Sequence, residues 1–250
     1  PAMLMALDLP IARTVFAHGF LQVGGEKMSK SRLTGISPYD LVSTFGADGY
    51  RYYFMRDISF GLDGNFSWEA MVARYNSDLA NDFGNLASRV LSMVGRYLEG
   101  IVPAPPSDAE LERAEEELRS VYEKAFGDMK RAIDEIAPDD ALKAAWSFVR
   151  KANAYVEEVA PWKLAKDEAQ RRRLEVVLYS LLDALRLLAL MTSCAIPEAA
   201  QELWTRLGAE GEVASKLFTD EGGWGRLSEG RKTTTGDPLF PRLEDDAAKA

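Results

Sequence analysis

Cysteine and histidine are almost absent from this sequence of 250 residues, which contains one of each, Cys194 and His18. A single cysteine excludes an internal disulfide, and one cysteine with one histidine cannot supply the four ligands of a tetrahedral zinc site. The sequence therefore predicts no metal site in this chain. Its cysteine usage fits a reducing, cytoplasmic setting.

Long apolar runs are also lacking. The longest, residues 176–191, is interrupted by Ser180, Asp183 and Arg186. It falls short of a membrane span and predicts a buried helix instead, so we expect no membrane partner. The sequence opens without the basic segment of a signal peptide.

An excess of positive charge is the third missing feature. The formal net charge is −9, which argues against a protein that covers nucleic acid by bulk electrostatics. Residues 1–107 hold nine Lys and Arg against ten Asp and Glu, and the remainder holds 21 against 29. Contacts with phosphates must therefore come from local clusters. One such cluster comprises Arg13, Lys27, Lys30 and Arg32.

The first third of the chain predicts one strand and two short helices. Residues 14–23 are β-branched and aromatic and lie between Pro10 and two glycines, which predicts a buried strand. Ser37 and the proline after it predict the start of a helix that Gly46 ends, and a second helix follows from about 48 to 57.

A turn-rich joint at 61–65 divides the chain into predicted domains at 1–64 and 65–243, with a tail at 244–250. Ser67 is the predicted N-cap of a long helix that Gly100 ends. An apolar stripe runs along that helix. It consists of Leu79, Phe83, Leu86, Val90, Met93 and Tyr97.

Helical patterns fill the rest of the second domain and predict an α-helical bundle. They cover residues 108–136, 139–159, 167–191 and 197–207. We expect Trp146, Trp204 and Trp224 to be packing residues. Arg171-Arg172-Arg173 predicts a solvated helix start, with contact to an RNA backbone as the alternative.

A short loop after the predicted strand carries the chemistry. It reads Gly24-Gly25-Glu26-Lys27-Met28-Ser29-Lys30-Ser31. Two ammonium groups three residues apart can close over a polyphosphate, and serine hydroxyls and backbone N–H groups can donate to its oxygens. For an arbitrary pair of lysines at this spacing, an ordinary solvated loop is the commoner interpretation.

The string Lys27-Met28-Ser29-Lys30-Ser31 resembles the signature loop of class I aminoacyl-tRNA synthetases, and the match includes the preceding strand and glycines. The resemblance implies that Lys27, Met28, Ser29, Lys30 and Ser31 bind ATP, with Mg²⁺ expected beside it. It assigns catalytic roles to Lys27 and Lys30, and Lys30 is the better candidate.

Three further segments resemble the methionyl-tRNA synthetase family. They are Val15-Phe16-Ala17-His18-Gly19-Phe20-Leu21, Asn81-Asp82-Phe83-Gly84-Asn85-Leu86-Ala87-Ser88-Arg89 and Ala160-Pro161-Trp162. In that family an Asn and an Arg four residues apart and a Trp after Pro read the anticodon. By resemblance these roles fall on Asn85, Arg89 and Trp162.

The physical chemistry of these three residues agrees with the resemblance. Asn85 and Arg89 are i, i+4 neighbours and can project together from one helix. An Asn amide and an Arg fork suit base edges, and an exposed Trp offers a face to an unstacked base. Without the resemblance, Trp162 would more often be a packing residue and the pair a solvated helix face.

The resemblance implies a mainly α fold: the carboxy-terminal remnant of a class I Rossmann-type catalytic domain, with its strand and signature loop, and then an α-helical anticodon-binding bundle. It implies a methionine–tRNA ligase, which activates methionine with ATP and transfers it to tRNA(Met). The sequence contains no His-x-Gly-His-type motif and begins at Pro1. We therefore expect the carboxy-terminal half of a monomeric enzyme, inactive without its amino-terminal half.

Two alternatives stay open. One is a non-catalytic tRNA-binding helical module, against which Lys27 and Lys30 speak. The other is a different class I synthetase, such as a leucine or cysteine enzyme, which Asn85, Arg89 and Trp162 together disfavour. His18 predicts a structural histidine in a buried strand more than a catalytic one.

Overall fold

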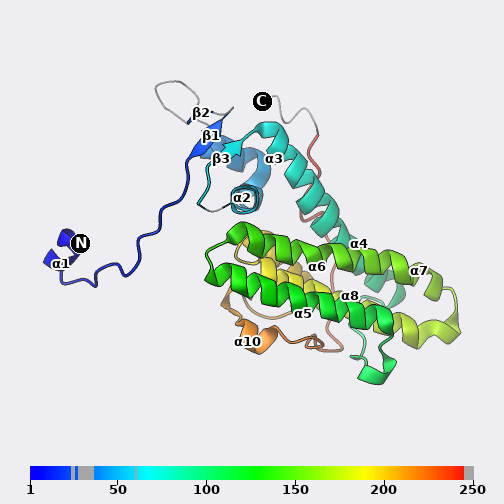
Figure 1. Cartoon of the computed structure of the whole chain (residues 1–250). Helices are drawn as coiled ribbons and strands as arrows, with labels where there is room; N and C mark the ends of the chain where they lie inside the picture. The colour runs from blue at the N-terminus through cyan, green and yellow to red at the C-terminus, as the bar shows by residue number, and fades with distance from the viewer. Residues whose placement is uncertain (24–25, 28–36, 60, 245–250) are drawn as a thin grey trace.

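The computed structural model describes residues 1–23, 26–27, 37–59 and 61–244 of this mainly helical chain (Figure 1). The strands are β1 (Leu21–Val23), β2 (Glu26–Lys27) and β3 (Gly64–Phe66). The helical elements are α1 (Ala2–Ala6), α2 (Pro38–Asp57), α3 (Trp68–Arg74), η2 (Tyr75–Gly84), α4 (Asn85–Tyr97), η3 (Asp108–Glu110), α5 (Arg113–Asp134), α6 (Pro138–Val159), α7 (Pro161–Leu164), η4 (Glu168–Gln170), α8 (Arg171–Thr192), α9 (Pro197–Arg206), η5 (Val213–Ser215) and α10 (Phe218–Glu221).

The three strands form a small sheet in the order β2-β1-β3, with β1 antiparallel to β2 and parallel to β3. The sequence did not predict β3, because Gly64 and Asn65 are poor strand formers and lie in what reads as a turn. Pairing with β1 overrides that preference. The N–H of Gly64 donates to the Phe20 carbonyl oxygen at 2.9 Å, and the N–H of Phe20 donates to Oδ1 of Asp63 at 2.7 Å.

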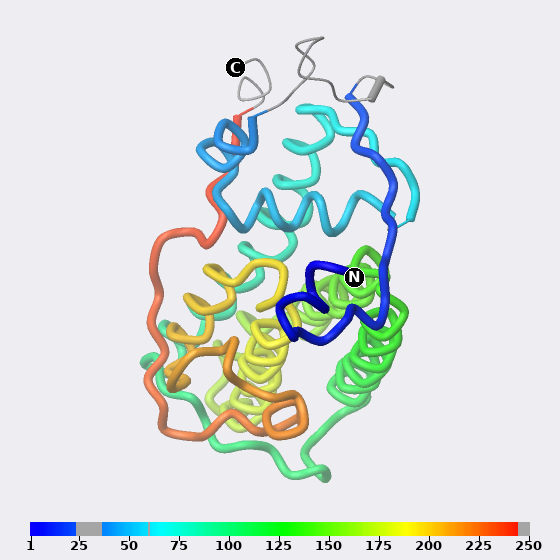
Figure 2. The backbone as a smooth tube through the Cα atoms, turned by 90° about the vertical axis from the view of Figure 1, so that its left-hand side faces the viewer, coloured from blue at the N-terminus to red at the C-terminus, as the bar shows by residue number. Residues whose placement is uncertain are grey.

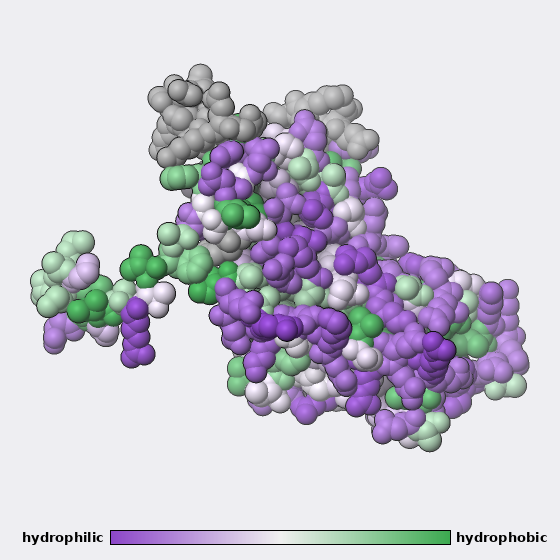
Figure 3. Space-filling view, in the orientation of Figure 1, coloured by the Kyte–Doolittle hydropathy of each residue, from purple (hydrophilic) through white to green (hydrophobic). Residues whose placement is uncertain are grey.

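The predicted buried strand at 14–23 was wrong for most of its length. Only Leu21–Val23 is a strand, and Val15 is 90% exposed. Figure 3 shows hydrophobic residues along the extended segment that leads to the sheet. A strand needs a partner for its backbone groups, and among the described residues the neighbours of β1 pair only with residues 21–23.

Helix α2 contains the break that the sequence predicted. Gly46 has φ 70° and ψ 166°, so the chain forms two helical segments that meet at this residue. That combination of dihedral angles is essentially restricted to glycine. The break turns the second segment, up to Asp57, beneath the strands, as Figure 1 shows.

The predicted long helix is confirmed as three consecutive elements, α3, η2 and α4. Ser67 is its N-cap, and its side-chain oxygen accepts from the N–H of Ala70 at 3.1 Å. The middle element, η2, has π-helical geometry over ten residues, which the apolar periodicity did not indicate. A π-helix has about one more residue per turn than an α-helix. The side chains of η2 that lie on the same face as a given residue of α4 are therefore not the ones that α-helical periodicity predicts.

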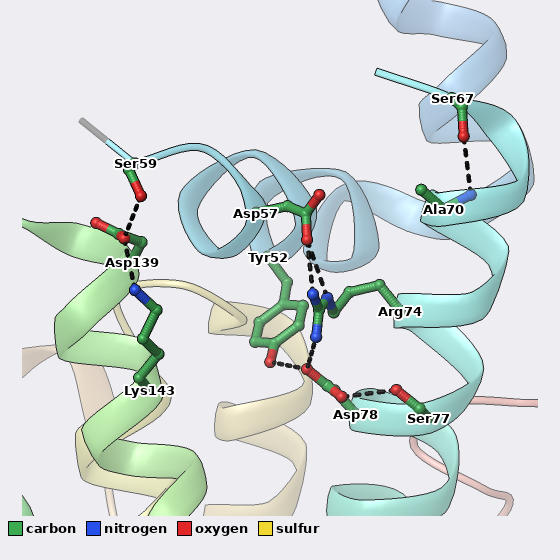
Figure 4. A network of polar contacts seen from close by, with 10 residues as sticks. All are labelled: Tyr52, Asp57, Ser59, Ser67, Ala70, Arg74, Ser77, Asp78, Asp139 and Lys143. Atoms are coloured by element: carbon green, nitrogen blue, oxygen red, sulfur yellow. Dashed lines mark hydrogen bonds and ion pairs between the residues drawn. The ribbon is translucent and has the colours of Figure 1, made fainter. Parts of the chain in front are cut away.

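A buried carboxylate in η2 joins this helix to α2 (Figure 4). Asp78 accepts hydrogen bonds from the Tyr52 hydroxyl and the Ser77 hydroxyl, each at 2.7 Å. Arg74 lies 3.3 Å from Asp78 and 2.7 Å from Asp57, so its guanidinium bridges the two carboxylates. Burial raises the pKa of the Tyr52 phenol, and the charge of Asp78 raises it further, which keeps this hydroxyl a donor.

The helices of the bundle follow the predicted segments, with α8 at its centre. Most side chains of α8 are buried around its whole circumference, as its composition predicted. Trp146 and Trp204 are core residues, as expected, and the Trp146 indole N–H donates to the backbone carbonyl of Asp78 at 3.2 Å. The start of α8 differs from the prediction, because a short 3₁₀ turn, η4, occupies residues 168–170.

The predicted solvated run at 171–173 is solvated only in part. Arg173 donates from both terminal nitrogens to Glu115, at 2.8 and 2.9 Å, and Glu115 is fully buried. The Tyr155 hydroxyl donates to the same carboxylate. Burial raises the pKa of Tyr155 well above its ordinary value, and the Glu115 charge adds to that shift. A buried carboxylate needs such partners, so Arg173 is a structural residue.

The carboxy-terminal segment returns from the bundle to η2, and Figure 2 shows it along the outside of the molecule. Asn76 forms two hydrogen bonds with the backbone of Leu243, each at 2.9 Å. Phe240 packs against Tyr75 and Phe83. One continuous hydrophobic core therefore includes α2, the bundle and this segment. The boundary near residue 64 and the tail at 244–250 stay predictions.

We expect Gly46→Ala to lower the free energy of unfolding by about 1–3 kcal/mol, because alanine disfavours this backbone conformation. Gly127 in α5 is a matched control. An added Cβ meets no atom within 4 Å at either glycine, but only Gly46 has a positive φ. Gly127→Ala should raise the free energy of unfolding by about 0.5–1 kcal/mol, because alanine is the better helix former. Urea unfolding followed by circular dichroism measures both, and changes of the same sign would contradict this account.

Candidate nucleic-acid interface

A groove lies between α4 and α7. Figure 1 shows α7 at the end of the bundle that is farther from the sheet. Its volume is about 370 Å³. The groove is lined by Ser88, Arg89, Ser92, Met93, Arg96, Tyr97 and Trp162. We call it the α4–α7 groove. It contains two of the three residues that the resemblance assigned to anticodon reading.

The position of Trp162 results from a backbone break between α6 and α7. Ala160 adopts the left-handed conformation, with φ 45° and ψ 65°, and ends α6. Pro161 follows at the first position of α7, where its missing N–H costs no helical hydrogen bond. The break that the sequence predicted at 160–162 is therefore present. It leaves Trp162 half-buried, packed against the core and lining the groove.

Arg89 lies on the opposite wall, in α4. Its side chain is 32% exposed, and its Nη2 lies 2.6 Å from Oε1 of Glu157 on α6. Glu157 is 61% exposed, so solvent screens this ion pair and its contribution to stability is small. The pair holds the guanidinium at the groove, and the remaining N–H donors of Arg89 stay available to a ligand.

Asn85 lies one turn before Arg89, and the structure does not bring it into the groove. It is the exposed first residue of α4, about 6 Å along the helix axis from Arg89. The i, i+4 spacing places both side chains on one side of the helix. The structure therefore brings Arg89 and Trp162 together and leaves Asn85 beyond the end of the cavity.

The lining of the groove carries positive charge in an otherwise acidic chain. Among its lining residues are two arginines, two serines, a tyrosine and a tryptophan, and none is acidic. Aromatic faces with neighbouring guanidinium groups are the features that bind unpaired nucleotides. The groove therefore has the chemistry of a site for single-stranded nucleic acid.

Sequence reasoning missed five residues of this groove. It assigned Met93 and Tyr97 to the apolar stripe, and both are half-buried, with one side facing the cavity. It gave no role to Ser88, Ser92 and Arg96. The available signal was helical spacing, because positions three, four and seven residues after Arg89 share its face.

The other predicted site falls largely outside the described residues. The backbone of Lys27 lies in β2, opposite Gln22 of β1. Met28, Ser29, Lys30 and Ser31 lie outside the described residues, so their ATP-binding roles stay predictions. A second cavity of about 340 Å³ lies beside β1 and is lined by His18, Tyr50 and Phe54, among others.

His18 does not lie in a buried strand, contrary to the sequence-based expectation. It is exposed, and its Nδ1 lies 2.8 Å from the Gly19 carbonyl oxygen, to which it donates. Over the described ranges, no three His, Cys, Asp or Glu residues lie close enough to hold a metal ion. No helix in those same ranges has the length and apolarity to cross a membrane.

Two protein families match the chain. One, described as "tRNA synthetases class I (M)", matches residues 1–91. The other, described as "Anticodon binding domain of methionyl tRNA ligase", matches residues 105–250. The two walls of the α4–α7 groove lie in different matches, because Arg89 falls in the first and Trp162 in the second.

Curated relatives agree with these matches. The chain is 47% identical over 254 residues to the methionine–tRNA ligase of Streptomyces coelicolor, covering 99% of this chain and 47% of the relative. It is 40% identical over 248 residues to the methionine–tRNA ligase of Thermotoga maritima, covering 98% of this chain and 38% of that relative. The chain therefore spans less than half the length of these relatives.

Solved structures show the same fold. Methionyl-tRNA synthetase of Mycobacterium tuberculosis in complex with methionyl-adenylate superposes with a TM-score of 0.85 at 36% identity, over 97% of this chain and 47% of that one. The free form of the same enzyme gives a TM-score of 0.83 at 33% identity, over 98% of this chain and 46% of that one.

The ion pair at the groove can be tested through Glu157→Gln. This change removes the charge that competes for Arg89, so affinity for single-stranded RNA should rise by up to about fivefold, because an exposed pair is worth at most about 1 kcal/mol. Fluorescence anisotropy with a labelled oligonucleotide measures it. Glu158→Gln is the matched control, since Glu158 pairs with Lys151 instead. An equal gain in RNA affinity in both variants would show a general charge effect and would contradict the assignment of Arg89 to RNA binding.

Proposed function

Because the chain belongs to the methionyl-tRNA synthetase family of class I aminoacyl-tRNA synthetases, we propose that it supplies the anticodon-reading part of a methionine–tRNA ligase. That enzyme activates methionine with ATP and transfers it to tRNA(Met). The α4–α7 groove is the observation that carries the proposal, because it joins an arginine and an aromatic face without any acidic lining residue.

In this proposal the groove receives an unpaired anticodon base. The base stacks on the face of Trp162 that lines the cavity. Arg89 donates to an acceptor edge of that base or its neighbour, in competition with its ion pair to Glu157. Asn85, one turn away and exposed, reads a base outside the cavity through its amide.

The proposal also gives the loop at 27–31 its family role. Lys27 and Lys30 bind the phosphates of ATP, with Mg²⁺, and stabilise the charge that develops on the departing pyrophosphate. Met28, Ser29 and Ser31 complete the loop around the nucleotide. The pairing of β1 with β2, which ends at Lys27, supports this role because it anchors the start of the loop.

The amino-terminal part of the enzyme is the partner that this function requires. By resemblance to the family, the methionine pocket and the rest of the nucleotide site belong to that amino-terminal part, and this chain spans only 47% and 38% of the two curated relatives. The alternative is a tRNA-binding module without catalysis. The lysines of the loop favour the ligase over this alternative, because a module that only binds tRNA has no use for an ATP-binding loop.

Trp162→Ala should weaken binding of an RNA hairpin with a CAU loop by about 1–3 kcal/mol, the usual value of one stacked base. Methionine activation by the complete enzyme should not change. Trp162→Phe keeps an aromatic face and should retain most of the affinity, which separates stacking from a packing defect. Equal binding of CAU and altered loops by wild-type protein would contradict the anticodon assignment.

Lys30→Ala in the complete enzyme should raise the activation free energy of adenylate formation by about 3 kcal/mol, a typical loss for one donor to a charged transition state. Pyrophosphate exchange measures this step, and hairpin binding should stay unchanged. Lys232→Ala removes an exposed lysine outside both sites and is the control. Normal exchange by the Lys30 variant would favour the non-catalytic alternative.

A further inference from the structure

The α4–α7 groove extends along α4 from Arg89 to the last turn of that helix. Arg96 and Tyr97 line this distal end. Arg96 follows Arg89 by seven residues, so the two lie on the same face of α4 and about 10 Å apart along its axis. One anticodon base on Trp162 does not account for a groove of this extent.

Arg96 is exposed and has the charge to bind an anion. Across the described ranges, the structure gives it no hydrogen bond and no ion pair within 4 Å, although Glu99 follows three residues later. Glu99 has φ 56° and lies past the end of the helix, so it does not continue the helical face of Arg96. Some exposed arginines of the bundle are paired, as Arg113 is with Glu117 and Arg119 with Glu123.

Tyr97 is a firmly held aromatic surface. Its ring is half-buried and packs against the hydrophobic core. Its carbonyl oxygen accepts from Nη1 of Arg171 at 2.8 Å, which ties the end of α4 to the start of α8. A ring fixed in this way loses little conformational entropy when a base stacks on it.

Ser92 and Met93, which lie between Arg89 and Arg96 on α4, also line the groove. Ser92 is exposed, and its hydroxyl can both donate and accept. A ribose 2′-hydroxyl needs a partner of this kind. The groove therefore combines two aromatic side chains and two arginines with serine hydroxyls.

We propose that the distal end of the groove is a second nucleotide subsite, in which Tyr97 stacks an unpaired base and Arg96 binds the adjoining phosphate. The ligand is an unpaired nucleotide of the same RNA loop that places another base on Trp162. This inference rests on the proposed function and extends it. It assigns two RNA-binding residues outside the Asn85, Arg89 and Trp162 set.

The first experiment tests the phosphate contact through Arg96→Ala. Binding of a CAU-loop RNA hairpin is measured by anisotropy over a series of salt concentrations. Losing one contact with single-stranded RNA should lower the slope of log K against log salt by about 0.7. Lys130→Ala is the control, because Lys130 is an exposed cation beside a different cavity on α5 and should leave the slope unchanged.

The second experiment tests stacking on Tyr97. Tyr97→Leu keeps an apolar side chain for the core and should weaken hairpin binding about 5- to 150-fold, whereas Tyr97→Phe should bind as the wild type does. Hairpins with an abasic residue at each loop position identify the nucleotide. At one loop position, the abasic substitution should lower the affinity of the hairpin for the wild-type protein. The same substitution should not lower its affinity for the Tyr97→Leu variant any further. Circular dichroism confirms that both variants are folded.

The outcomes separate this inference from the proposed function. An unchanged salt slope for Arg96→Ala, or the same abasic profile for wild-type protein and Tyr97→Leu, overturns the second subsite. If Trp162→Ala still weakens binding in that case, the proposed anticodon site stands alone. If Trp162→Ala also binds normally, both proposals fail.

Discussion

The buried carboxylate of Asp78 is the interaction on which the arrangement of the two ends of this protein depends. It lies in the π-helical element η2, and Tyr52 from α2 and Arg74 from α3 both bind it. An unpaired charge at this depth would cost several kcal/mol, so the three side chains hold α2 and the long helix at one fixed distance. The indole of Trp146 extends the same contact to α6 through the Asp78 carbonyl.

This junction joins the sheet side of the molecule to the groove side. Helix α2 lies beneath the strands, and the element that follows η2 is α4, which carries Asn85, Arg89 and Arg96. The carboxy-terminal segment closes the junction from outside through Asn76 and Phe240. The loop proposed to bind ATP and the groove proposed to read RNA are therefore attached to a single packed core.

Local signals predicted most of the helices correctly, because a cap or a break depends on few residues. Ser67 caps α3 and Gly46 breaks α2, as their chemistry required. Three features depended on distant partners and were missed or misjudged. Strand β3 forms only because β1 pairs with it, residues 14–20 form no strand, and η2 is π-helical although its apolar pattern reads as an α-helix.

The sequence by itself determined the chemistry of the candidate sites: the i, i+4 spacing of Asn85 and Arg89, the tryptophan after a helix-breaking Ala-Pro, and two lysines in a glycine-flanked loop. Only the tertiary structure decided that Trp162 faces α4, that Glu157 pairs with Arg89 and that Asn85 stays outside the groove. The groove joins α4 to α7, more than 60 residues later in the chain. Packing of α6, α7 and α8 brings those walls together, and no local pattern encodes that contact.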